Sequence, residues 1–233
     1  MSEISENVKA VREKIALAAE KAGRNAEDIL LCAASKMNDA ERVREAVLAG
    51  VDCCGENRVQ ELQEKQPKGA YTGKPVHFIG HLQTNKVNKV VGKVDLIQSV
   101  DREELLLAID KEARKKGLVQ EILLEVNIGE EESKSGYSPE EAVKTAERMK
   151  EYPGVHLMGL MAIPPISEFP GENCKYFSAM RQLFIDIAGK KLDNVSMVCL
   201  SMGMSNDFED AIQEGSTMVR VGTAIFGARN YNL

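Results

Sequence analysis

The chain has 233 residues, of which 43% are hydrophobic and 28% are charged, and its net charge is −6. These values are typical of a globular protein large enough to bury a core without disulfides or structural metals. The negative charge and the absence of basic blocks disfavour nucleic-acid binding. No apolar run approaches the ~20 residues of a membrane span. The five cysteines include no C-x-x-C pair, which favours free thiols in a reducing compartment.

A helix is predicted at the amino terminus. Apolar residues recur at spacings of three and four from Ile4 to Ala22, and Gly23 follows, which indicates one amphipathic helix. The segment starts with acidic residues and so does not resemble a signal or transit peptide. We expect an extra helix packed on the domain and a cytoplasmic protein.

Short apolar runs then alternate with helix-like stretches along the chain. The runs cover 29–35, 51–57, 76–81, 95–100, 121–127, 156–163, 197–203 and 218–227. The helical stretches cover 39–49, 56–65, 83–91, 101–116, 139–150, 173–188 and 206–214, with expected N-caps at Asp39, Thr84, Asp101 and Ser138. Eight strands separated by helices predict an α/β fold, a single (β/α)8 TIM barrel over residues 1–233. An open doubly wound sheet is the alternative.

Polar side chains gather at the predicted carboxyl ends of the strands, where barrels place their chemistry. The strand ends are Lys36, Asn57, His81, Ser99, Asn127, Met161-Ala162, Ser201 and Arg220. Burying unpaired polar groups costs a few kcal/mol each, so a set directed at one face indicates a site.

Two stretches after the last two strands are suited to holding a phosphate. In "SMGMSND" (201–207) a helix is expected to open near Ser205, whose hydroxyl and neighbouring N–H groups could bind an anion. An ordinary serine N-cap would look the same. In "RVGTAIFG" (220–227), Gly222 permits close approach and Thr223 adds a hydroxyl. Barrels often bind phosphate at this position, but neither stretch is a nucleotide-binding motif.

A strand-end lysine and arginine beside a phosphate site narrow the choice of ligand. A lysine in a partly dry pocket becomes nucleophilic toward carbonyls, so a phosphorylated aldehyde such as pyridoxal 5′-phosphate (PLP) would suit Lys36. Arg220 near the pyridine nitrogen would keep that nitrogen unprotonated, since a guanidinium cannot accept a proton. A neutral ring is a weak electron sink, which favours mild chemistry or simple holding.

The chain resembles the pyridoxal phosphate homeostasis family nearly from end to end, and several motifs carry the resemblance. They are "AASK" (33–36), "GENRVQEL" (55–62), "HFIGHLQTNK" (77–86), "SVDR" (99–102), "EVNIGEEESKSG" (125–136), "GLMAIPP" (159–165) and "LSMGMSNDFEDAIQEGSTMVRVGTAIFGAR" (200–229). The resemblance implies a fold-type III barrel, similar to the amino-terminal domain of alanine racemase. This chain differs from many relatives after Lys36: they carry a proline within a few residues, whereas this chain reads Met37-Asn38-Asp39.

The resemblance also implies a site and a role. PLP would be held as a Schiff base on Lys36, with Arg220 at the pyridine nitrogen and Ser205, Gly222 and Thr223 at the phosphate. Asn57, Ser201 and Met204 would line the same pocket, whereas His81 and Lys134 lie in family motifs without an assigned role. The implied function is intracellular PLP homeostasis without catalytic turnover, and it could include the supply of PLP to PLP-dependent apoenzymes. Without the second domain of the racemases, their dimer contacts are lost, so we expect a monomer.

A strand-end lysine is compatible with two other functions. A minimal racemase-like PLP enzyme acting on amino acids is the alternative, although only "ARNYNL" follows the last strand and leaves no room for the second domain that racemases use. A class I aldolase would use the lysine without a cofactor. No metal site is expected. His77 and His81 are four residues apart and, by strand alternation, point to the same side, but on a predicted strand they do not share the helical face that HExxH requires, and packing explains Cys53 and Cys54.

Overall fold

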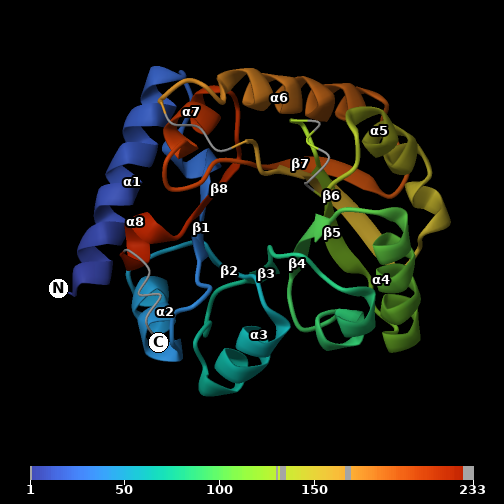
Figure 1. Cartoon of the computed structure of the whole chain (residues 1–233), viewed down its shortest axis with the longest axis horizontal. Coiled ribbons are helices and arrows are strands. Elements are labelled where there is room, and N and C mark those ends of the chain that lie inside the picture. The colour runs from blue at the N-terminus through green and yellow to red at the C-terminus, as the bar shows by residue number, and fades with distance from the viewer. Residues whose placement is uncertain (1, 130, 132–134, 166–168, 228–233) are drawn as a thin grey trace.

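The computed structural model describes residues 2–129, 131, 135–165 and 169–227. Its eight strands are all parallel and close into a barrel in chain order, which confirms the predicted (β/α)8 fold and excludes the open sheet. Figure 1 shows the barrel surrounded by helices. The strands are β1 (Leu30–Ala34), β2 (Cys53–Glu56), β3 (Val76–Phe78), β4 (Leu96–Val100), β5 (Gln120–Val126), β6 (Val155–Ala162), β7 (Val195–Ser201) and β8 (Met218–Val221).

The helices follow the predicted order. The α-helices are α1 (Glu3–Lys21), α2 (Ala40–Leu48), α3 (Val59–Lys65), α4 (Glu103–Lys116), α5 (Pro139–Glu147), α6 (Cys174–Gly189), α7 (Phe208–Gln213) and α8 (Thr223–Phe226). Short 3-10 helices are η1 (Ala26–Asp28), η2 (Gln66–Lys68), η3 (Thr84–Lys89) and η4 (Met149–Glu151). No helix in this described part of the chain is both long and apolar enough to cross a membrane.

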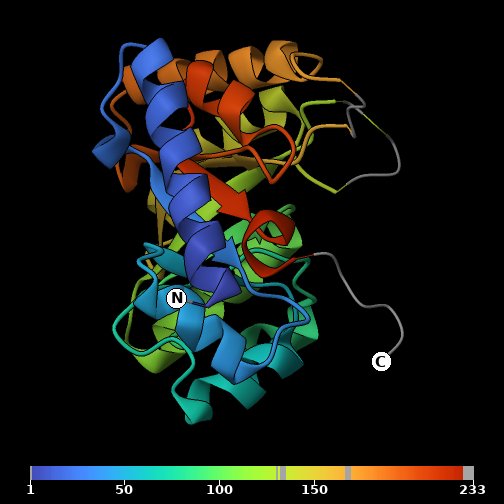
Figure 2. The same cartoon turned by 90° about the vertical axis from the view of Figure 1, so that its left-hand side faces the viewer.

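The amino-terminal helix α1 packs along the outside of the barrel, as predicted. It contacts α2, α7 and α8, and Figure 2 shows it running across the face of the molecule nearest the viewer. Its buried stripe includes Ile4, Val8, Val11 and Ile15. The side chain of Asn7 donates to the carbonyl oxygen of Ile225 at 3.0 Å. This contact joins α1 to the segment that follows the last strand.

Three local predictions are wrong. The stretch 83–91 forms the 3-10 helix η3 and no α-helix, in keeping with a sequence rich in β-branched valines, which have low helix propensity. The run 218–227 is a strand only to Val221 and then forms α8.

The third wrong prediction concerns helix caps. The predicted caps Asp39 and Ser138 are confirmed. Asp101 does not cap α4, because its carboxylate contacts Arg102 and His81. Thr84 is the first residue of η3 and not its cap.

The core has two parts, because alternate residues of each strand face opposite sides. The larger part lies between the strands and the helices. The smaller part fills the inside of the barrel and is rich in sulfur: it contains Cys32, Cys53, Leu96, Leu123, Met161, Cys199 and Met218. All five cysteines are free, and four of them are buried.

Candidate functional site

Arg220 is the central polar residue inside the carboxyl end of the barrel. It lies on β8, is 4% exposed, and is the register partner of Cys32 on β1. One guanidinium nitrogen donates to Ser201 Oγ at 2.6 Å and another donates to the carbonyl oxygen of Ala162 at 2.9 Å. Burial lowers the pKa of this arginine. No ion pair of Arg220 is found among the described residues, so a buried cation is held here mainly by neutral groups.

Ser201 connects Arg220 to the far side of the barrel interior. Its hydroxyl accepts from Arg220 and donates to Oε1 of Gln98 on β4 at 2.7 Å. Because a hydroxyl has only one proton, these two contacts fix its direction. Gln98 is fully buried, and its residue type gave no signal in the sequence. The guanidinium is therefore oriented by side chains from β4 and β7.

Ser205 joins the two loops predicted to hold phosphate. The N–H groups of Gly222 and Ala224 point at its Oγ, at 3.2 and 3.4 Å. Ser205 is not the N-cap of α7, which begins at Phe208 after Asp207, so that alternative is excluded. The loops after β7 and β8 thus meet as predicted. Thr223 opens α8 with an exposed side chain, and Met204 is exposed on the other loop.

Lys36 lies in the loop two residues after β1 and is half-buried. The loop is held on both sides of the lysine. The carbonyl oxygen of Ser35 accepts from Lys65 Nζ at 2.9 Å, and the N–H of Met37 donates to Glu61 at 2.7 Å. Met37 has a left-handed φ of 62°, which is uncommon for a residue with a side chain. Helix α3 therefore fixes the backbone that carries Lys36.

Asn57 follows β2 directly and is pressed against the loop after β3. A Cβ on Gly80 would lie 2.3 Å from the carbonyl oxygen of Asn57, so only glycine fits at that position. The side-chain Oδ1 of Asn57 is buried and has no hydrogen-bond partner among the residues that the structure describes. A buried acceptor without a donor is unusual, and a donor group on a bound ligand would satisfy it.

Glu125 is a residue of the barrel mouth that the sequence did not single out. It lies on β5, two residues after Leu123 of the interior cluster, so the two positions share one side of the strand. Burial raises the pKa of its carboxyl to about 7, with the charge of Asp101 acting in the same direction and Arg220 opposing it. Perturbed carboxyl groups of this kind cluster at functional sites.

Other strand-end residues support loops. The hydroxyl of Ser99 donates to the carbonyl oxygen of Gly80 at 2.6 Å. The side-chain amide of Asn127 donates to the carbonyl oxygen of Glu131 at 2.8 Å. His81 is 56% exposed and contacts Asp101 at 3.1 Å. Strand alternation predicted that His77 and His81 point to the same side. This prediction is wrong, because β3 ends at Phe78 and leaves His81 outside the strand, while His77 is buried. Lys134 lies outside the described residues.

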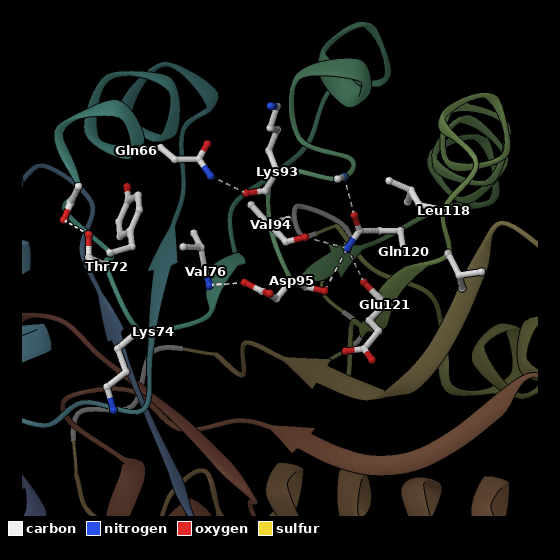
Figure 3. A pocket seen from close by; sticks show the side chains of 14 residues that line it. Gln66, Thr72, Lys74, Val76, Lys93, Val94, Asp95, Leu118, Gln120 and Glu121 are labelled. Carbon is white, nitrogen blue, oxygen red and sulfur yellow. Dashed lines mark hydrogen bonds between the residues drawn. The ribbon is translucent and has the colours of Figure 1, made fainter.

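A cavity of about 670 Å³ lies at the opposite, amino-terminal end of the strands. Figure 3 shows its lining, which includes Asp95 and Gln120 at the starts of β4 and β5. Both side chains form hydrogen bonds to the protein's own backbone. Asp95 accepts the N–H of Val76 at 2.7 Å, and the Gln120 amide contacts three backbone carbonyls. This end of a barrel ordinarily serves stability, so we place the site at the carboxyl ends.

Comparison with known proteins identifies the family of this chain. The model of the family described as "Alanine racemase, N-terminal domain" matches residues 6–230. A pyridoxal phosphate homeostasis protein of Aquifex aeolicus is 45% identical over 226 residues, which is 97% of this chain and 98% of that protein. That of Escherichia coli strain K12 is 41% identical over 237 residues, 100% of this chain and 99% of that protein. The chain belongs to the pyridoxal phosphate homeostasis protein family.

Solved structures show where the family fold recurs. A protein of unknown function from Bifidobacterium adolescentis superimposes with a TM-score of 0.90 at 39% identity, covering 96% of this chain and 94% of that one. PipY of Synechococcus elongatus, solved with PLP bound, gives 0.82 at 30% identity, covering 96% and 100%. An alanine racemase of Clostridium difficile shares the fold alone, with a TM-score of 0.69 at 17% identity over 97% of this chain and 58% of that one.

Proposed function

We propose that this chain binds PLP at the carboxyl end of its barrel, holds it as a Schiff base on Lys36, and serves intracellular PLP homeostasis without catalytic turnover. The observation that carries the proposal is Arg220, a buried cation fixed by Ser201 and Ala162 with guanidinium protons left to donate. Relatives named for PLP homeostasis and the PLP-bound PipY structure support it.

The residues at the barrel mouth fit the parts of this cofactor. Lys36 would supply the amine, and the N–H groups directed at Ser205 by Gly222 and Ala224 lie where a phosphate would be expected. Thr223 would add its hydroxyl, and the buried Oδ1 of Asn57 would accept a hydrogen bond from a donor group of the ligand. Ser201 and Met204 would line the same pocket.

Arg220 bears on whether the bound cofactor is used for turnover. PLP supplies an aldehyde and an electron sink when it is bound. A guanidinium donates protons and cannot accept one, so Arg220 would leave the pyridine nitrogen unprotonated and the sink weak. We therefore favour holding and delivery to apoenzymes, by a cytoplasmic monomer, over catalysis.

Absorption spectroscopy tests the tether. The purified protein should show the visible band of a PLP–lysine adduct, and borohydride should fix the cofactor to one peptide containing Lys36. Lys36→Ala should be colourless, whereas Lys89→Ala, at an exposed site, should keep the band. Labelling of Lys65 in place of Lys36 would overturn the assignment.

A separate measurement decides between holding and a racemase-like activity. The loaded protein is incubated with a panel of L-amino acids and the products are resolved by chiral chromatography. We expect no turnover above that of free PLP. Faster transfer of PLP to an apoenzyme than from an equal amount of free PLP would support delivery, and equal rates would argue against it.

A further inference from the structure

Three side chains with metal-binding atoms meet inside the barrel. Cys32 of β1, Cys53 of β2 and His77 of β3 bring their sulfur and ring nitrogen atoms within 4.8 Å of one another. Their exposures are 0%, 2% and 6%. Two thiols and one imidazole are the donor set of soft metal sites. The sequence did not suggest this set, because three separate strands contribute to it.

The strand register explains why both sulfurs point into the barrel. Cys32 and Cys53 are register partners on neighbouring parallel strands, and both belong to the interior cluster. Cys54, the next residue, belongs to the cluster between the strands and the helices. Gly55 leaves room for the Cys32 sulfur, since a Cβ there would lie 2.9 Å from that atom.

His77 is oriented so that its Nδ1 faces the thiols as an acceptor. Ser201 donates its hydroxyl to Gln98 Oε1, so the Gln98 NH₂ group is directed away from Ser201. That group lies 2.9 Å from His77 Nδ1 and also donates to the Met218 sulfur at 3.1 Å. Since an amide NH₂ can only donate, Nδ1 carries a lone pair. Cys53 Sγ lies 3.6 Å from the same nitrogen.

Arg220 lies beside the two thiols. It is the register partner of Cys32 on the neighbouring strand β8. Its buried guanidinium therefore places a positive charge next to sulfur atoms that bind a metal as thiolates.

We propose that Cys32, Cys53 and His77 form a binding site for a single thiophilic metal ion, Cu(I). The donors are soft, and no carboxylate joins the cluster among the described residues. With two cysteines and one histidine, Zn(II) takes a water as its fourth ligand, and the apolar, buried side chains of the interior cluster surround this position. Cu(I) is satisfied by three ligands. Two thiolates and Cu(I) carry one negative charge, which the neighbouring guanidinium of Arg220 balances. The thioether of Met218 is a further soft group beside the site.

A metal ion at this site would change hydrogen bonds at the carboxyl end of the barrel. An ion on His77 Nδ1 competes with the Gln98 amide for the same lone pair, so Gln98 must give up that hydrogen bond. Gln98 holds Ser201, and Ser201 holds Arg220. The Cu(I) site therefore couples to Arg220 through two hydrogen bonds. The expected effect of the metal on bound PLP rests on the proposed function. The proposal that the metal binds does not.

The experiment uses the full-length, PLP-free protein under anaerobic, reducing conditions. Cu(I) is supplied as the complex of a chromophoric Cu(I) chelator, both to native protein over hours and during refolding. We expect one equivalent bound, with at least a hundredfold loss of affinity in Cys53→Ala. The matched control is Cys54→Ala, which alters the neighbouring buried thiol on the other side of β2 and should bind as the parent does.

Further measurements keep the test independent of folding. Circular dichroism and thermal melting establish that each variant is folded, and X-ray absorption should show two sulfur ligands and one nitrogen ligand on copper. Cys199→Ala, inside the same cluster but outside the ligand set, should retain binding. Failure to take up Cu(I) by either route, equal loss in Cys54→Ala, tighter binding of Zn(II), or a Cys32–Cys53 disulfide in place of metal uptake would overturn the proposal.

A second readout separates this proposal from the proposed function. Cu(I) is added to PLP-loaded protein and the visible band is followed, with a shift expected in the parent and none in Cys53→Ala. Copper uptake by a protein that never binds PLP would sustain the metal site and remove the proposed function. PLP binding without copper uptake would do the reverse.

Discussion

Lys65 donates a hydrogen bond from Nζ to the carbonyl oxygen of Ser35 at 2.9 Å, one residue before Lys36. The same ammonium contacts the carboxylates of Glu56 at 2.9 Å and Glu61 at 2.8 Å. Lys65 is the only buried lysine among the described residues. The lysine proposed to bind PLP is thus held in place by a second lysine, which is itself neutralised by two acids.

Replacing Lys65 tests this arrangement. Lys65→Met would leave the fully buried Glu56 without its cation, and breaking a buried pair in this way costs about 3–5 kcal/mol. We expect a loss of that size in the free energy of unfolding, measured with urea, and weaker PLP binding because the Lys36 loop loses a contact. Lys68→Met is the control, since its pair with Glu64 is exposed and should contribute under ~1 kcal/mol. Equal effects of the two substitutions would contradict the role of Lys65.

Glu125 makes stability depend on pH. Its pKa in the folded protein is raised to about 7 by burial and by Asp101, so the folded state favours the protonated form. The stabilisation from this group is complete below the unfolded pKa near ~4.3 and is lost as pH rises through about 7. Glu125→Gln stays neutral and should gain stability relative to the parent between pH 5 and 8, by roughly 2–3 kcal/mol.

Urea unfolding at several pH values measures this difference. The matched control is Glu121→Gln, on the same strand but exposed, which should run parallel to the parent across the range. A constant offset between Glu125→Gln and the parent would show that the carboxyl does not titrate in this window.

Arg220 should contribute to PLP binding through charge-assisted hydrogen bonds. Arg220→Gln removes the charge while keeping a polar side chain that can donate hydrogen bonds. A hydrogen bond to a charged group contributes about 1.5–3 kcal/mol, so we expect a loss of PLP affinity of about ten- to a hundredfold in absorption titrations. Arg44→Gln, at an exposed position on α2, should bind PLP as the parent does. Unchanged affinity in Arg220→Gln would remove Arg220 from the site.

Ser205 should act on the phosphate group alone. Ser205→Ala removes the oxygen toward which the N–H groups of Gly222 and Ala224 point. A neutral hydrogen bond contributes about 0.5–1.5 kcal/mol, so PLP affinity should fall by about three- to tenfold. Pyridoxal, which lacks the phosphate, should bind the variant and the parent equally. An equal loss for both ligands would place Ser205 away from the phosphate.

Much of the candidate site could be predicted because a barrel orders its strand ends. The order of apolar runs sufficed to place four residues at the carboxyl ends of their strands, where the structure also has them: Lys36, Asn57, Ser201 and Arg220. Side-chain contacts were less accessible. For Ser205 a helix cap stayed open as the alternative to phosphate binding, and only the structure shows that its oxygen faces the N–H groups of a loop 17 residues further along the chain.

The errors occur where local pattern and tertiary contact compete. Asp101 has the right residue type and position for an N-cap, but Arg102 and His81 bind its carboxylate. His77 and His81 were placed on one side of a strand that ends at Phe78. The first prediction failed because neighbouring side chains bind the carboxylate of Asp101. The second failed because β3 ends three residues before the end of the apolar run that was predicted to be the strand.

The sequence by itself determined the barrel, because hydrophobic periodicity and turn residues act over short distances and repeat eight times. It also determined which residue types stand at the strand ends. Only the tertiary structure decided that Lys65 is buried beneath Ser35 and that Cys32, Cys53 and His77 meet inside the barrel. Those relationships depend on strand register and closure, which bring together side chains that no local pattern relates.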